Sequence, residues 1–266
     1  MGTVRISPMD VLWYKKSGPE KGPPVFFLHG LFASMHNWQS VTKKLNDTFS
    51  IFSADLPNHG NSPRLEDVTQ LNMMTMALET IQALGVGPVH LVGHSLGGKV
   101  AMLLALHHSE WVKSLLVEDI APKTYPPWFA SVMRAMSNLP LSKISSRQEA
   151  DERLSKDIFD PALRTFLLTN LDRRDGSFSW RIHIDALIRG GPNIAGFPKP
   201  DLKNELPALF VRGGKSPYVE DEDYQTIREL FPSVVIETFP EADHWLHARE
   251  PEAFAKRVRR FLEEAH

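Results

Sequence analysis

The feature that most restricts the fold of this chain is an alternation of short apolar, β-branched runs with longer segments of helical periodicity. Such an alternation favours an α/β fold in which helices cover a mostly parallel sheet. The predicted strands are Val25–Leu28, Phe49–Leu56, Val89–Val92, Val112–Ile120, Ala208–Val211 and Val234–Phe239. The predicted helices are Asn37–Leu45, Leu71–Leu84, Ser95–His108, Asp221–Phe231 and Pro251–Glu264. We expect Thr3–Tyr14 to form an antiparallel start to the sheet.

One long stretch interrupts this alternation. Residues 121–200 contain several helical patterns and no clear strand. An insertion of this length is too long for a structureless loop in a compact domain. We therefore expect a core made of residues 1–120 and 201–266, with residues 121–200 inserted as a helical cap. Most of the aromatic side chains in this insertion are expected to pack the cap itself.

Composition excludes several classes of protein. The 266 residues include 30 Lys plus Arg and 32 Asp plus Glu, a formal net charge of −2, so no basic surplus favours nucleic acid as a partner. The absence of cysteine removes disulfides, cysteine-based zinc sites and thiol nucleophiles. The longest apolar run, Val100–Leu106, is far shorter than the roughly 20 residues of a membrane span. The N-terminus resembles neither a signal peptide nor a myristoylation site, and we expect a cytoplasmic protein without membrane attachment.

The strongest chemical signal is the sequence Gly93-His94-Ser95-Leu96-Gly97. It matches G-x-S-x-G, follows a predicted strand and opens a predicted helix, which is the context of a nucleophile elbow. The glycines allow close backbone approach in a strained turn, and the helix N-terminus favours a developing negative charge. Ser95 is therefore the candidate nucleophile. The alternative is an N-cap serine in a glycine-rich turn.

With this motif, the chain resembles the α/β-hydrolase fold family over nearly its whole length. His29-Gly30-Leu31-Phe32 is similar to the loop after the third strand of that family. The resemblance implies that the backbone N–H groups of Leu31 and Leu96 form an oxyanion hole, which would stabilise a tetrahedral intermediate. The side chains that we expect to contact substrate are those of Phe32, His94, Trp128, Phe129 and Trp245.

The segment His244-Trp245-Leu246-His247, after the last predicted strand, resembles the loop that carries the general base in this family. We expect His244 to take the proton of the nucleophile and later return it to the leaving group. His247 is the alternative base, and a metal site made by the two histidines is disfavoured because no cysteine is near. Asp243 stands where family members often have glycine, and its carboxylate would stabilise a charged imidazole if it pointed inward.

The acid of the triad is less directly indicated. In most of the family it follows the strand that matches Ala208–Val211, but here the sequence Gly-Gly-Lys-Ser-Pro contains no carboxylate. The strand after the nucleophile helix ends in Asp119, within an Asp-Ile-Ala-Pro stretch. Both stretches, together with Leu167–Leu171, resemble a subgroup of small bacterial esterases and their mitochondrial relatives. The resemblance implies Asp119 as the acid, with Asp221 as the alternative, and Glu118 must face the other side of the strand.

The implied triad of Ser95, His244 and Asp119 describes a serine carboxylic-ester hydrolase that forms an acyl-enzyme. We expect it to act on short- to medium-chain acyl esters as small-molecule substrates, with no metal or organic cofactor. The same triad would serve an acyl-CoA thioesterase, which basic cap residues such as Arg173, Arg174 and Arg181 would suit, or a carbon–carbon bond hydrolase. A non-catalytic ligand-binding relative is the alternative outside enzymes, and the sequence does not indicate an oligomeric state.

Overall fold

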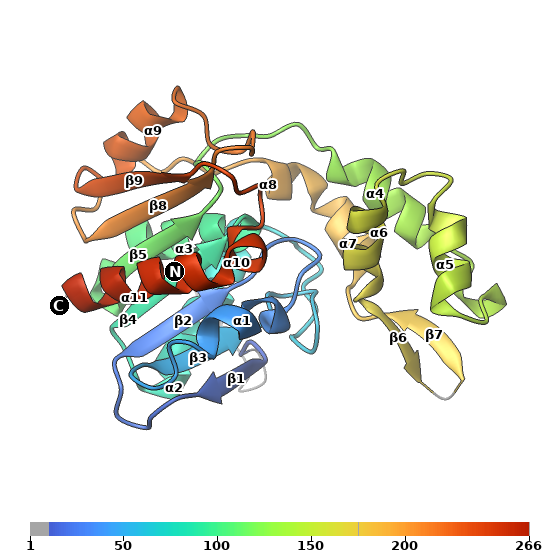
Figure 1. Ribbon diagram of the computed structural model, residues 1–266, viewed down its shortest axis with the longest axis horizontal. Helices are drawn as coiled ribbons and strands as arrows, with labels where there is room; N and C mark the ends of the chain where they lie inside the picture. Colours follow the sequence, from blue (N-terminus) through green and yellow to red (C-terminus); the bar gives the residue numbers. More distant parts are fainter. Residues whose placement is uncertain (1–10, 175, 266) are drawn as a thin grey trace, which may run out of the picture.

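The computed structural model describes residues 11–174 and 176–265, and within them a seven-stranded sheet forms the centre of the larger body (Figure 1). Its order is β1-β3-β2-β4-β5-β8-β9. These strands are β1 (Tyr14–Ser17), β2 (Pro24–Leu28), β3 (Ser50–Ala54), β4 (Val89–His94), β5 (Val112–Glu118), β8 (Ala208–Gly213) and β9 (Val234–Phe239). All neighbouring strands are parallel except β1 and β3. The predicted α/β class with a mostly parallel sheet is confirmed.

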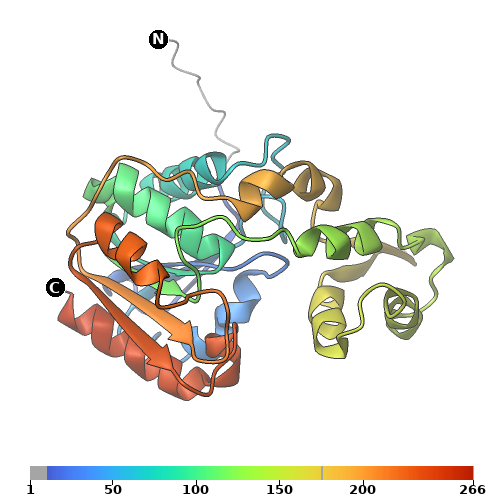
Figure 2. The same cartoon turned by 90° about the horizontal axis from the view of Figure 1, so that it is seen from above.

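Helices cover both faces of this sheet (Figure 2). One face carries α2 (Gln70–Leu84), α3 (Leu96–His107) and α9 (Asp223–Leu230), and the other carries α1 (Gln39–Thr42), α10 (Leu246–Arg249) and α11 (Pro251–Glu264). Because side chains alternate along a strand, Phe26 packs in the core beneath α2 and α3 and Phe27 in the core beneath α1 and α11. No helix in the described part of the chain is long and apolar enough to cross a bilayer.

Most predicted elements are found within a few residues of their expected bounds. The last strand and the last helix have the predicted bounds. The predicted helix Asn37–Leu45 is instead a 3₁₀ turn, Met35–Trp38, followed by the short α1. Of the expected strand Thr3–Tyr14, residues 3–10 lie outside the described residues. The described strand β1 begins only at Tyr14 and pairs antiparallel with β3, as expected.

A second group of elements lies between β5 and β8. It contains α4 (Phe129–Ser137), α5 (Arg147–Leu154), α6 (Pro161–Leu168), α7 (Ile184–Arg189) and α8 (Gly191–Ala195). Helices α4 to α7 lie to one side of the sheet in both views, and α8 returns to the core (Figures 1 and 2). The expectation that residues 121–200 contain no strand is wrong, because β6 (Leu171–Arg174) and β7 (Ser177–Trp180) form a hairpin. Each strand has only four residues, too few to show a clear alternation of apolar and polar positions.

Candidate active site

Ser95 stands between β4 and α3 in a backbone conformation that non-glycine residues rarely adopt, with φ 51° and ψ −118°. Such strain costs roughly 1–3 kcal/mol and persists only where the surrounding structure enforces it. The Ser95 N–H donates to the carbonyl of Glu118 on β5 at 3.0 Å. Gly97 approaches β2 so closely that a Cβ would lie 2.4 Å from the carbonyl oxygen of Leu28. These contacts fix the serine at the carboxyl end of the sheet.

Two backbone N–H groups beside the serine have no acceptor within residues 11–174 and 176–265, those of Leu31 and Leu96. Leu96 is the first residue of α3, where an N–H has no partner inside the helix. Both residues line the cavity that contains Ser95. The next amide along the first loop is engaged, because the N–H of Phe32 donates to Nε2 of His59 at 3.2 Å. The two unpaired amides are therefore available to an anionic oxygen.

His244 and Asp119 form a hydrogen-bonded pair. Nδ1 of His244 donates to Oδ2 of Asp119 at 2.7 Å, with the carboxylate fully buried and 12% of the histidine side chain exposed. Because Nδ1 carries the hydrogen, Nε2 of the neutral ring is left to accept a proton. The N–H of Gly213 donates to Oδ1 of Asp119 at 2.8 Å, and the hydroxyl of Ser216 donates to Oδ2. The loop after β8, which was expected to lack the acid, thus supplies hydrogen bonds to it.

The alternative residues have other partners. Asp221 has a 75% exposed side chain and pairs with Arg212 at 2.9 Å. His247 is buried, and its Nδ1 donates to Oε1 of Glu118 at 2.8 Å while its backbone N–H bonds the same oxygen at 2.9 Å. Glu118 and Asp119 therefore bind different histidines. Of these four residues, only Asp119 contacts His244.

Buried side chains support the base loop. Nε2 of His94 donates to the carbonyl of His244 at 2.9 Å, and the His94 ring centroid lies 4.6 Å from that of His244 and 4.9 Å from that of His247. Burial, and then these two neighbouring histidines, keep the pKa of His94 well below its usual range. His94, Glu118 and His247 bring three potential metal ligands within 4.8 Å of one another. Hydrogen bonds already engage Nε2 of His94, Nδ1 of His247 and the carboxylate.

The remaining neighbours of His244 differ in their roles. The Tyr218 ring stacks on the imidazole, with centroids 3.9 Å apart and planes inclined by 20°. Burial raises the pKa of the Tyr218 hydroxyl to about 12, so it is uncharged near neutral pH. Asp243 does not point inward, because its carboxylate accepts from the N–H of Trp245 at 3.0 Å and from Nε of Arg249 at 2.8 Å. The ring is therefore oriented by Asp119 and covered by Tyr218.

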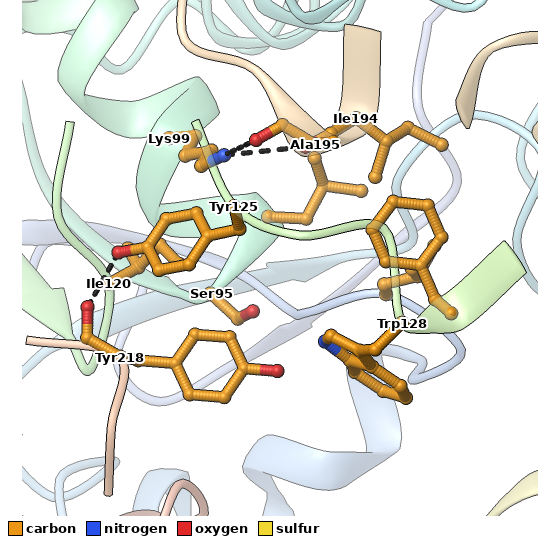
Figure 3. A pocket seen from close by; sticks show the side chains of 11 residues that line it. Ser95, Lys99, Ile120, Tyr125, Trp128, Ile194, Ala195 and Tyr218 are labelled. Carbon is orange, nitrogen blue, oxygen red and sulfur yellow. Dashed lines mark hydrogen bonds between the residues drawn. The ribbon is translucent and has the colours of Figure 1, made fainter. Parts of the chain in front are cut away.

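Ser95 opens into a cavity (Figure 3). The lining residues are Leu31, Ser95, Leu96, Lys99, Ile120, Tyr125, Trp128, Phe129, Ile194, Ala195 and Tyr218. Figure 3 shows the serine hydroxyl pointing into the space among Tyr125, Tyr218 and Trp128. The walls come both from the edge of the sheet and from residues 121–200, and they are mostly apolar.

Comparison with known proteins identifies the family. Residues 25–257 match the model of the alpha/beta hydrolase family. This chain belongs to the alpha/beta hydrolase family. It is 36% identical over 267 residues to the sn-1-specific diacylglycerol lipase ABHD11 of Mus musculus, covering 97% of this chain and 86% of that protein.

Two further relatives agree with this placement. The esterase YbfF of Escherichia coli is 30% identical over 240 residues, covering 90% of this chain and 92% of that protein. The solved structure of a marine microorganism esterase is 36% identical, with a TM-score of 0.91 over 94% of this chain and 99% of that chain. The expected resemblance to the α/β-hydrolases and to small bacterial esterases is confirmed.

In this hydrolase the residues expected to contact substrate separate into two groups. Trp128 and Phe129 line the cavity. Phe32 and His94 do not line it and are buried at 1% and 3% exposure; the positive φ of Phe32 and the hydrogen bond of His94 turn both side chains into the core. Trp245 lines a separate groove between α6 and α10. The structure therefore does not support direct substrate contact by Phe32 or His94.

Three residues at the site of this hydrolase have no role predicted from the sequence. Tyr218 stacks on His244, Ser216 donates to Asp119 and Lys99 lines the cavity. Ser216 lies in the Gly-Gly-Lys-Ser-Pro stretch, which contributes to the resemblance to the small bacterial esterases and contains no carboxylate. Lys99 is four residues after the candidate nucleophile, and that spacing on a helix was the available signal.

Proposed function

We propose that this hydrolase cleaves carboxylic esters through an acyl-enzyme, with Ser95 as nucleophile, His244 as general base and Asp119 as the acid that orients it. Membership of the family, with esterase and lipase relatives, makes the chain a carboxylesterase-type hydrolase. The residue roles and the acyl chain length are the proposal. The observation that carries it is the 2.7 Å bond from His244 to Asp119, with the His244 ring stacked on Tyr218, which lines the cavity that contains Ser95.

In the acylation step the Ser95 hydroxyl oxygen forms a bond to the carbonyl carbon of the ester while its proton passes to Nε2 of His244. The carbonyl oxygen becomes an oxyanion, which the N–H groups of Leu31 and Leu96 stabilise. The bond from carbon to the alcohol oxygen then breaks. The proton on His244 passes to the departing alcohol, and the acyl group remains on the serine.

In the deacylation step a water molecule attacks the acyl group in the way that the Ser95 hydroxyl attacked the ester. It gives a proton to His244 as its oxygen bonds the acyl carbon, and the Ser95 oxygen leaves and recovers that proton. Asp119 stabilises the imidazolium formed in each step and fixes the ring so that Nε2 accepts and returns the proton. All of these groups come from this chain and from water.

The cavity supports a short or medium acyl chain. Its apolar side chains, such as Ile120, Phe129 and Ile194, suit a small hydrocarbon group. Residues 121–200 would act as a cap that closes this space, because Trp128, Phe129 and Ile194 come from that segment. A long acyl chain would have to extend beyond the cavity.

The test is hydrolysis of p-nitrophenyl esters from acetate to palmitate, together with a diacylglycerol, by wild type and by Ser95→Ala. We expect turnover on short and medium esters that falls by at least about 10⁴ in the variant. Labelling with a fluorophosphonate should modify Ser95 by mass spectrometry. Ser155→Ala, which removes an exposed hydroxyl bonded only to the carbonyl of Glu152, should change nothing.

The possible contrary results separate the parts of the proposal. Full activity in folded Ser95→Ala would exclude the nucleophile. Labelling without ester turnover would leave a reactive serine and contradict the substrate class. Neither labelling nor turnover would favour the non-catalytic ligand-binding alternative. A preference for palmitate or diacylglycerol would contradict the proposed acyl length alone.

A further inference from the structure

Lys99 is a charged residue inside an otherwise uncharged cavity. It lines the cavity together with Ser95, and no other Lys, Arg, Asp, Glu or His is among the lining residues in the described part of the chain. Lys99 is only 2% exposed. Lysine is almost never fully buried without a partner, so its position calls for a reason.

No carboxylate lies within 4.0 Å of the Lys99 ammonium in residues 11–174 and 176–265. Nζ instead donates to the carbonyls of Ala195 at 2.9 Å, Gly196 at 2.6 Å and Ile194 at 3.3 Å. It also lies 4.8 Å from the centre of the Tyr125 ring. Burial lowers its pKa to about 7. The charge is therefore solvated by neutral groups and lacks a counter-ion.

Helix α3 places Lys99 one turn after Ser95, at the cavity that both residues line. The N–H of Lys99 donates to the carbonyl of Ser95 at 3.0 Å, so the two residues stand one turn apart on the same face of α3. Helical side chains lean toward the N-terminus of their helix. Figure 3 shows both side chains at the same cavity, with Nζ at the end formed by Ala195. An acyl group bonded to Ser95 would extend along the wall that Lys99 completes.

Two of the carbonyl groups that bind Lys99 also accept a hydrogen bond from another side chain. Nε2 of Gln70, on α2, donates to the carbonyl of Gly196 at 2.7 Å and to that of Ile194 at 3.4 Å. The Lys99 contact with Ile194 is also the longest of its three. A ligand oxygen could replace that contact while Gln70 keeps the carbonyl partnered. If the role of Lys99 were only to hold these carbonyl groups in place, its side chain would not need to line the cavity.

We infer that Lys99 binds a carboxylate at the far end of the acyl group, so that the preferred substrates are half-esters of short dicarboxylic acids. This inference rests on the proposed function, because it places the acyl group on Ser95. Hydrolysis of such a half-ester would give a dicarboxylate and an alcohol. A charge-assisted bond in a site with little water is stronger than a bond to a neutral amide.

The experiment measures kcat/KM for the monoethyl esters of succinate, glutarate and adipate. Each is compared with the ethyl ester in which a carboxamide replaces the distal carboxylate. The two substrates of a pair have nearly the same size and differ in their charge. In wild type the carboxylate substrate should be better by about tenfold or more for at least one chain length. In Lys99→Met the ratio should fall to one or below.

The matched control is Lys123→Met. Lys123 lies 5.2 Å from the same Tyr125 ring, but it bonds Asp223 at 2.6 Å and does not line the cavity. This variant removes an equal charge nearby and should keep the wild-type ratio. Both substrates are measured on the same enzyme preparation, so partial unfolding of a variant cancels in the ratio.

A wild-type ratio of one or below at all three chain lengths would overturn the inference, and this result needs no variant to fold. A ratio unchanged in Lys99→Met would also overturn it and leave the lysine as a structural tie. Failure of the proposed function looks different. In that case wild type would not hydrolyse ethyl butyrate and a fluorophosphonate would not label Ser95.

Discussion

Two adjacent carboxylates at the end of β5 bind two histidines three residues apart, His244 before α10 and His247 within it, and they do so in different surroundings. In the Asp119–His244 pair 12% of the histidine side chain is exposed, and its ring stacks on Tyr218, which lines the cavity. In the Glu118–His247 pair the histidine is 3% exposed, and its ring packs 4.9 Å from that of Trp38. The chemical groups are nearly the same. We propose that only the first pair takes part in proton transfer, because its histidine is the more exposed of the two and contacts a residue that lines the cavity.

The second pair stabilises the first through the backbone. Glu118 binds the base loop with its side chain and the nucleophile turn with its carbonyl, which accepts from Ser95. His94 donates to the carbonyl of His244. The buried pair therefore connects the two segments that have to meet for catalysis. We therefore expect that breaking the Asp119–His244 pair removes activity, whereas breaking the Glu118–His247 pair lowers the stability of the fold.

The largest expected effect is that of Asp119→Asn on turnover. The amide nitrogen would face Nδ1 of His244 and favour the wrong tautomer, so kcat should fall by on the order of 10⁴. Oδ1 would still accept from Gly213, and the fold should persist. The measurement is ester hydrolysis with circular dichroism as the folding check. Asp221→Asn should keep wild-type activity, and the reverse outcome would transfer the acid role to Asp221.

The next effect is a fall in the free energy of unfolding as the pH decreases. Burial lowers the pKa of His29 to about 4 and that of His59 to about 3, whereas an unfolded histidine titrates near 6.5. Below about pH 6.5 the unfolded chain therefore binds protons that the folded chain does not. The free energy of unfolding should fall as pH decreases toward 4, by up to roughly 1.4 kcal/mol per pH unit for each histidine.

Urea unfolding between pH 7 and pH 4 measures this slope. His94, whose pKa burial also lowers, should add to it. His59→Gln should reduce the slope, while His36→Gln, at an exposed position, should not. A stability that does not change between pH 7 and pH 4 would contradict the prediction that the buried histidines are neutral.

Glu118→Gln tests the buried pair directly. The amide oxygen can accept from His247, but the bond loses its charge, so the free energy of unfolding should fall by about 1–3 kcal/mol. Turnover of the folded enzyme should change by less than about tenfold, because the pair does not border the cavity. Glu237→Gln breaks a partly exposed pair with Arg257 and should cost at most about 1 kcal/mol. A loss of turnover as large as that of Asp119→Asn would remove the distinction between the pairs.

The smallest expected effect is that of Tyr218→Phe. The phenyl ring keeps the stacking on His244 and loses only a neutral hydroxyl, so kcat/KM should change by about threefold or less. Tyr218→Ala removes the ring and should have the larger effect. Equal losses in both variants would show that the hydroxyl, rather than the ring, acts on the base.

Local sequence patterns predicted much of the fold because strands, helices and the serine turn depend on neighbouring residues. The segment around Ser95 carries its own glycines, strand and helix, and so its conformation could be read without knowing the rest of the chain. The contact of Ser216 with Asp119 joins residues 97 positions apart. Nothing local to Ser216 indicates that partner. Phe32 was misplaced for the same reason, because its amide is bound by His59 from another loop.

Trp128 should make binding in the cavity detectable by intrinsic fluorescence. It lines the space around Ser95 and is still 43% exposed, whereas Trp38 is 1% exposed. The emission of an indole shifts to shorter wavelength when water leaves its surroundings. A ligand that fills the cavity should therefore blue-shift the intrinsic fluorescence, and subtraction of the Trp128→Phe spectrum isolates that signal from the other five of the six tryptophans. The molecule carries its own reporter of occupancy, readable without a chromogenic substrate.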